Sequence, residues 1–293
     1  MKDRLDPLIE DRAKWLFSSN PFARTAKAGL NGLLGYQHTL DLGEALKDKP
    51  ASEIMDHVAA RLARQVQVTG LEHIPAHGAA LIVANHPTGI ADGVMLWHAL
   101  ATRRPDLFYF ANHDILRVLP QMEALIAPVE WREEKRTRAK TRATMDYMRA
   151  AMAEDRLGVI FPSGRLAKRR GLRLHERPWM ASAAMMARKF DLPVIPINIR
   201  ARNSALFYLF DVIHPSLRDI TLFHETLNKH RQPYRITIGA PITPADLPAQ
   251  ASDGIEVLRA ATLALGGQHA PAVSLLDSSR PLAWPKGTAP AAT

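Results

Sequence analysis

Short apolar runs alternate with longer segments of helical periodicity over most of the chain after residue 65. Runs of six to eight mostly apolar residues predict six strands, at 79–84, 107–112, 125–131, 157–162, 193–200 and 234–239. Helical patterns separate most of them, at 92–101, 132–154 and 178–190. This alternation predicts an α/β fold: a single domain with a largely parallel central sheet flanked by helices. The wholly apolar run "LIVA" is typical of a strand covered on both faces.

The same patterns divide the chain into three parts. Residues 1–65 mix polar helical stretches with apolar patches such as "WLFSSNPF", which predicts an N-terminal helical region that is a candidate for membrane docking. Residues 66–266 hold the alternating α/β pattern. Residues 267–293 are rich in Ala, Pro, Gly and Ser, and we expect this tail to be disordered.

Composition narrows the choice of partner. Thirty-eight Lys and Arg against 29 Asp and Glu give a net charge of +9, which favours a polyanion, either nucleic acid or an anionic membrane surface. Aromatic residues are only 6% and are not interleaved with the basic runs, so nucleic acid is not the expected partner. The charged N-terminus and the lack of a run of about 18 apolar residues predict a cytoplasmic location without a membrane span. The chain has no cysteine, which removes thiol catalysis.

A histidine and an aspartate flank a tight turn directly after the apolar run at 81–84. The segment "LIVANHPTGIADG" places His86 at the predicted carboxyl end of a strand, where parallel sheets bind ligands, and Asp92 at the start of the next helix. A compact turn would bring the carboxylate to one ring nitrogen and leave the other to accept a proton from a hydroxyl. Alternatively, Asp92 serves only as a helix cap. Spacing alone leaves both interpretations open.

A second turn, in "GVIFPSGRLAKRRGLR", repeats this arrangement with a group of cations. Five cations, Arg165 to Arg173, occur within nine residues without an acid. A glycine turn and an arginine at a strand end suit a phosphate group, and Arg165 is the best candidate. The later cations, from Lys168 onward, are equally consistent with a solvated basic loop. The run Arg132–Arg142 contains acids at helical spacing and indicates an exposed helix face.

The two turns together resemble blocks of the glycerolipid acyltransferase superfamily, of the 1-acylglycerol-3-phosphate and lysophospholipid type, and especially its hemolysin-like bacterial branch. The matching residues are Asn85, His86 and Asp92, then "FPSGR" at 161–165, then "LPVIPINI" around Pro196. Five residues separate the histidine from the aspartate here, whereas four is commonest in the family, and Ser163 stands where the third block usually has Glu. Arg132 is a loose match to the second block.

The resemblance implies that residues 66–266 form an acyltransferase domain, with His86 and Asp92 as the catalytic base and its orienting group. It implies transfer of a fatty acyl group from acyl-CoA or acyl-ACP, as co-substrate, to a hydroxyl of a lysophospholipid or lyso-amino-lipid. The implied substrate-binding residues are Asn85, Gly89, Ser163, Gly164, Arg165 and Lys168. No cofactor or metal is implied, and the expected place is the inner face of the cytoplasmic membrane, as a peripheral protein.

Two other functions remain open at this stage. A lipid-ester hydrolase would use Ser163 as its nucleophile, although "IFPSGR" lacks the first glycine of the G-x-S-x-G pattern. A nucleic-acid-binding protein would also be basic, although no helix-turn-helix or zinc pattern is present. A catalytically inactive scaffold is disfavoured by the intact histidine and aspartate.

Overall fold

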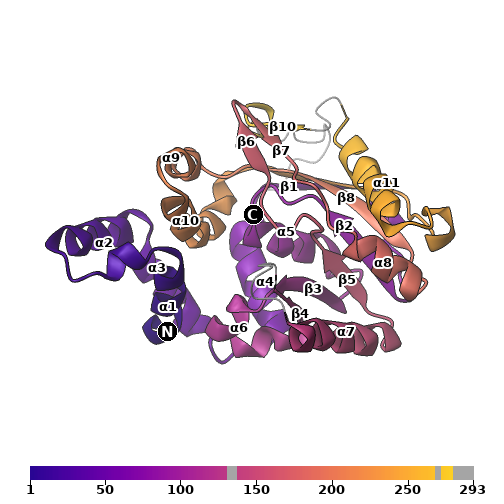
Figure 1. Cartoon of the computed structure of the whole chain (residues 1–293), viewed down its shortest axis with the longest axis horizontal. Coiled ribbons are helices and arrows are strands. Elements are labelled where there is room, and N and C mark those ends of the chain that lie inside the picture. Colours follow the sequence, from indigo (N-terminus) through magenta and orange to yellow (C-terminus); the bar gives the residue numbers. More distant parts are fainter. Residues whose placement is uncertain (131–136, 268–271, 280–293) are drawn as a thin grey trace, which may run out of the picture.

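A seven-stranded sheet forms the centre of the molecule in the computed structural model, which describes residues 1–130, 137–267 and 272–279 (Figure 1). The strands are β1 (Val66–Thr69), β2 (Ala80–Ala84), β3 (Leu107–Asn112), β4 (Ile126–Val129), β5 (Leu157–Ile160), β8 (Val194–Arg200) and β9 (Tyr234–Ile238). Their order is β1-β9-β8-β2-β5-β3-β4, and only β8 and β9 pair antiparallel. The predicted fold class is therefore confirmed. All six predicted runs contain a strand, while β1, a half-exposed edge strand, adds a seventh.

Helices cover both faces of this sheet. One face packs against α4 (Ala51–Leu62) and α5 (Ile90–Leu100), and the other against α7 (Arg138–Ala153), α8 (Ser182–Lys189) and α11 (Ala251–Ala264). Successive side chains of a strand point to opposite faces. In β2, Ile82 therefore joins the first core and Leu81 and Val83 join the second. This explains why the run "LIVA" has no polar position.

The N-terminal helices pack beside the sheet rather than on it. They are α1 (Lys2–Arg12), α2 (Pro21–Leu33) and α3 (Tyr36–Leu46), and Figure 1 shows them next to α9 (Ala205–Ile213) and α10 (Pro215–Leu227). A small apolar core joins the two groups, and it includes Leu16 and Phe210. In the patch "WLFSSNPF", Leu16 is buried and the Trp15 indole donates to Ser216 Oγ at 3.1 Å, whereas Phe22 is 73% exposed.

Three short strands form a second sheet. The strands β6 (Lys168–Arg170) and β7 (Arg173–His175) make a hairpin, and β10 (Ala272–Ser274) pairs with β7. Thus the basic run predicted as a loop is partly extended structure. The expected disordered tail begins at 267, and its residues 268–271 and 280–293 lie outside those described, while β10 belongs to the remainder. No helix in the described ranges is long and apolar enough to cross a bilayer.

Candidate active site

The turn after β2 is fixed to the neighbouring strand β8 by one side chain. The Asn85 amide donates to the Ile199 carbonyl at 2.9 Å and accepts from the Ile199 N–H at 2.7 Å. These two hydrogen bonds continue the pairing of β2 with β8 beyond the end of β2, with a side-chain amide in place of the backbone. Asn85, expected among substrate-binding residues, is 2% exposed with both ends of its amide occupied in this way. It therefore holds the position of the adjacent His86.

His86 and Asp92 lie together at this turn. His86 Nδ1 is 2.9 Å from Asp92 Oδ2, with the carboxylate fully buried and the imidazole 18% exposed. The carboxylate lies off the line of the Nδ1–H bond, so the contact has the distance but not the direction of a hydrogen bond. Catalytic hydrogen bonds are often poorly aligned until substrate binds. The imidazole also stacks on Phe161, with ring centroids 4.2 Å apart.

Asp92 also caps the helix that follows. Its Oδ2 accepts the N–H groups of Thr88 at 2.9 Å and Gly89 at 3.0 Å. Gly89 has φ +101° and ψ −138°, a conformation that is accessible in practice to glycine, and this folds the turn back onto the carboxylate. The cap predicted for Asp92 is therefore present, and its carboxylate also lies close enough to His86 for the orienting role to stay a prediction. Gly89 also lines the cavity described below.

A chain of hydroxyls reaches Asp92 from β9, which lies two strands away from β2 in the sheet. Thr88 Oγ1 lies 2.5 Å from Asp92 Oδ1 and 2.5 Å from the hydroxyl of Tyr234 on β9. Because an ionised carboxylate only accepts, Thr88 gives its one proton to Asp92 and accepts the proton of Tyr234. Burial and the charge of Asp92 raise the pKa of Tyr234, which keeps it a donor.

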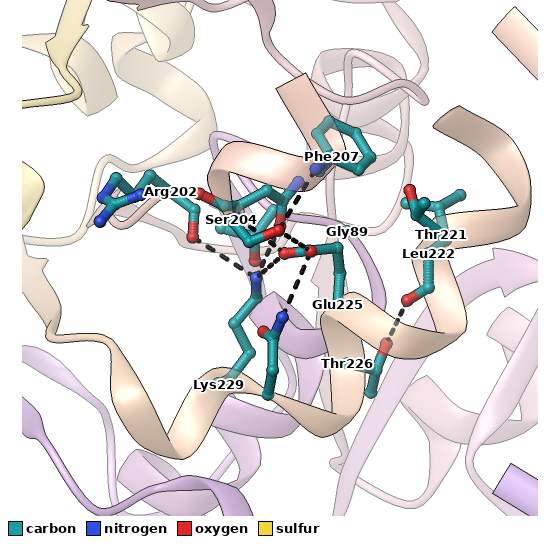
Figure 2. A network of polar contacts seen from close by, with 12 residues as sticks. Gly89, Arg202, Ser204, Phe207, Thr221, Leu222, Glu225, Thr226 and Lys229 are labelled. Atoms are coloured by element: carbon teal, nitrogen blue, oxygen red, sulfur yellow. Dashed lines mark hydrogen bonds and ion pairs between the residues drawn. The ribbon is translucent and has the colours of Figure 1, made fainter. Parts of the chain in front are cut away.

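A buried ion pair stands behind this turn (Figure 2). Lys229 Nζ donates to Glu225 at 2.8 Å, to Asn203 Oδ1 at 2.7 Å and to the Arg202 carbonyl at 3.4 Å. All three partners are acceptors, so the amine carries three protons. Burial raises the pKa of Glu225, but the charge of Lys229 and bonds from Lys229 and Ser204 outweigh burial and lower it. Burial lowers the pKa of Lys229, while the negative charges of Glu225 and Asp92 oppose this effect.

The second turn lies against the first. The Ala167 N–H donates to the His86 carbonyl at 2.9 Å, and Gly164 adopts φ +60°. Gly164, Arg165 and Lys168 line the same cavity as His86. The Ser163 hydroxyl donates to the Arg165 carbonyl at 2.9 Å, and Ser163 is 8% exposed and does not line the cavity. This placement disfavours the alternative in which Ser163 is a nucleophile.

Glu176 is a site residue that the sequence patterns did not single out. One carboxylate oxygen accepts the His86 N–H at 3.2 Å and the other accepts the Trp179 indole N–H at 3.0 Å. Burial raises the pKa of Glu176, although hydrogen bonds from Trp179 and the His86 N–H, together with the nearby Ser163 hydroxyl, oppose it. The carboxylate therefore lies next to Ser163, the position at which the family's Glu is absent. Glu176 lies eleven residues beyond that block, and no spacing pattern linked it to His86.

These elements surround a cavity of about 1810 Å³. The carboxyl ends of β3, β4 and β5 contribute to one side, and α1, α3 and α4 contribute apolar side chains such as Leu8, Leu46 and Ile54. Several of the basic side chains on the lining lie in another part, Arg165, Lys168, Arg169, Arg177 and Arg218, of which Arg218 is paired with Asp211 and Asp219. Burial and the charges of Arg165 and Arg218 lower the pKa of Arg177, as expected for neighbouring cations. The cavity thus has an apolar part and a cationic part. Arg132 lies outside the described residues.

Comparison of this chain with known proteins finds a matching family model and several similar proteins. A family model described as Acyltransferase matches residues 65–200. The lyso-glycine lipid O-acyltransferase of Phocaeicola vulgatus is 26% identical over 70% of this chain and 75% of its own length. A protein of the same name from Bacteroides thetaiotaomicron is 24% identical over 67% and 72%, respectively. The crystal structure of the 1-acyl-sn-glycerophosphate (LPA) acyltransferase PlsC from Thermotoga maritima is 14% identical, covering 92% of this chain and 98% of that one, with a TM-score of 0.49.

Proposed function

Because this chain belongs to the Acyltransferase family, we propose that it transfers a fatty acyl group from a CoA or acyl-carrier-protein thioester to the hydroxyl of a lysolipid. The single observation that carries the mechanism is the 2.9 Å approach of His86 Nδ1 to the buried carboxylate of Asp92 beside the cavity. A histidine whose one nitrogen faces a carboxylate has its other nitrogen available as a base. The names of the two relatives favour a lyso-amino-lipid as the acceptor.

The reaction needs one proton carrier and no covalent enzyme intermediate. His86 takes the proton of the acceptor hydroxyl as that oxygen attacks the thioester carbonyl. The C–S bond then breaks, and the imidazolium returns the proton to the departing thiolate, so the products are an ester and a free thiol. The buried charge of Asp92 stabilises the imidazolium between these steps. Asp92 is itself held by Thr88 and Gly89.

The two parts of the cavity suit the two ends of an acyl lipid. The apolar side chains of α1, α3 and α4 offer a place for a fatty chain. Arg165 and Lys168, with Arg177 nearby, offer positive charge to an anionic head group, either phosphate or carboxylate, next to the turn at Gly164. Asn85 and Ser163 support this surface through backbone contacts.

We also propose that the protein works as a peripheral protein at the inner face of the cytoplasmic membrane. A lysolipid with a long chain partitions into a bilayer, so the enzyme must meet it there. The net charge of +9 supports attraction to anionic lipid, at about 1 kcal/mol for each cation near the surface.

An acyl-transfer assay tests the proposed reaction. Labelled acyl-CoA and acyl-ACP are offered with a panel of acceptors: a lyso-amino-lipid, lysophosphatidate, glycerol 3-phosphate and another lysophospholipid. His86→Ala is expected to lower the rate by about 10²–10⁴. His98→Ala, at an exposed position on the same helix as Asp92, is the matched control and is expected to keep full activity. Transfer that survives His86→Ala unchanged would refute the mechanism.

A further inference from the structure

The hairpin of β6 and β7, which we call the basic hairpin (residues 168–175), projects from the body of the molecule. Lys168 pairs with His175, and Arg170 pairs with Arg173, so Gly171 and Leu172 form the turn. Figure 1 shows β6 at the outer margin of the molecule, with β10 on the far side of β7. One edge of the hairpin is therefore unpaired within the described chain.

Four cations lie on this hairpin, and none of them has an acidic partner among the described residues. Lys168, Arg170 and Arg173 are exposed and Arg169 is half-buried. Across residues 1–130, 137–267 and 272–279, no carboxylate forms an ion pair with any of them. By contrast, the exposed cations of α7, Arg142 and Arg149, both pair with Asp146. The charge of the basic hairpin is thus available to an external anion.

Two exposed leucines accompany these charges. Leu172 at the turn is 62% exposed, and Leu276 is 63% exposed. They belong to adjacent segments, because the Leu275 N–H donates to the Leu172 carbonyl at 3.0 Å. Large apolar side chains surrounded by Lys and Arg are typical of segments that enter the headgroup region of a membrane. An acidic protein would satisfy the charges, but a bilayer accounts for the exposed leucines as well.

The basic hairpin is continuous with the site. Lys168 and Arg169 line the cavity, and the Ala167 N–H, one residue before β6, bonds to the His86 carbonyl. We propose that the basic hairpin docks on the anionic surface of a lipid bilayer, with Leu172 at the headgroup boundary. Docking there brings the cavity to the layer in which a lysolipid lies. The inference rests on the proposed acyl transfer for its purpose, but the binding itself does not depend on that reaction.

The test compares two double variants of equal charge change. Arg170→Glu/Arg173→Glu alters the basic hairpin, and Arg142→Glu/Arg149→Glu alters the exposed face of α7. Sedimentation measures binding to phosphatidylglycerol/phosphatidylcholine vesicles and to phosphatidylcholine vesicles alone. We expect the hairpin variant to bind anionic vesicles at least about tenfold more weakly, since each cation contributes about fivefold, and the α7 variant to change less than threefold. Leu172→Ser is expected to weaken binding severalfold without a change in charge.

Activity separates docking from catalysis. On a long-chain lysolipid held in anionic vesicles, the hairpin variant should be slower by about the same factor as its loss of binding. On a short-chain, water-soluble acceptor it should match the wild type. Equal losses of vesicle binding in both double variants would overturn the proposal, as would a hairpin variant that keeps vesicle binding but no longer uses acyl-ACP. Vesicle binding by a wild type that transfers no acyl group would instead refute the proposed function alone.

Discussion

Replacement of Asp92 by Asn separates the observed helix cap from the proposed orienting role of this side chain. Its Oδ2 accepts two backbone N–H groups and approaches His86, while its Oδ1 accepts the Thr88 hydroxyl. An asparagine can place its carbonyl oxygen at the first position and its NH₂ at the second. Thr88 then accepts from this NH₂ and turns its own proton toward Tyr234. All heavy atoms keep their positions, and only the charge is lost.

The structure sets the size of the expected effect. At 2.9 Å, an ion pair with an effective dielectric constant of about 20 is worth about 6 kcal/mol. Solvent that reaches the partly exposed imidazole reduces this figure, so we expect Asp92→Asn to lower kcat by about 10²–10⁴. The two backbone bonds change from charged to neutral acceptors, and this costs at most about 2 kcal/mol of unfolding free energy.

The assay is steady-state acyl transfer at fixed pH, combined with urea denaturation to measure the free energy of unfolding. His98→Ala provides the same control as before. If Asp92→Asn keeps a rate within about threefold of the wild type, Asp92 acts only as a helix cap and the orienting role is refuted. A loss of stability much larger than about 2 kcal/mol would show that the asparagine does not fit as described.

Three further predictions concern the groups behind this turn. Thr88→Val removes the donor to the Asp92 carboxylate and the acceptor of the Tyr234 proton, so it should lower the free energy of unfolding by about 2–4 kcal/mol. Thr88→Ser keeps the hydroxyl and should retain most of this stability, so equal urea midpoints for the two variants would contradict the hydroxyl chain. Lys229→Met leaves the buried carboxylate of Glu225, 1% exposed, without its partner and should lower the free energy of unfolding by about 3–5 kcal/mol. The double variant Lys229→Met/Glu225→Met should be less destabilised than the single variant, and strictly additive effects in denaturation would show that the pair does not interact. Because the pKa of Glu225 is lowered, its contribution to stability is present above the ordinary value of 4.5 and is lost as pH falls through the lowered value. Glu225→Gln should therefore show a smaller fall in the free energy of unfolding below about pH 4.5 than the wild type, and an unchanged acid profile would contradict this prediction.

The pattern of apolar residues along the sequence was sufficient to predict the buried sheet and its covering helices. A strand buried on both faces must be apolar at every position, and β2 is such a strand, so its run was readable without coordinates. The turn from Asn85 to Asp92 was equally readable, because four of its polar contacts join residues at most six positions apart. The predicted family agrees with the Acyltransferase model that matches residues 65–200, and the motifs behind this prediction are short-range patterns of the same kind.

The tertiary structure alone decided which distant residues complete the site. Glu176 lies 90 residues beyond His86, and Tyr234 lies 146 beyond Thr88. Their approach depends on the order of the strands and on the antiparallel pairing of β8 and β9, which no local periodicity encodes. Buried Lys229 looks like any surface lysine in the sequence, because its burial results from Glu225 and Asn203 packing around it. Periodicity reports which face of an element is apolar, whereas the partner of a buried polar group is fixed only when the elements meet.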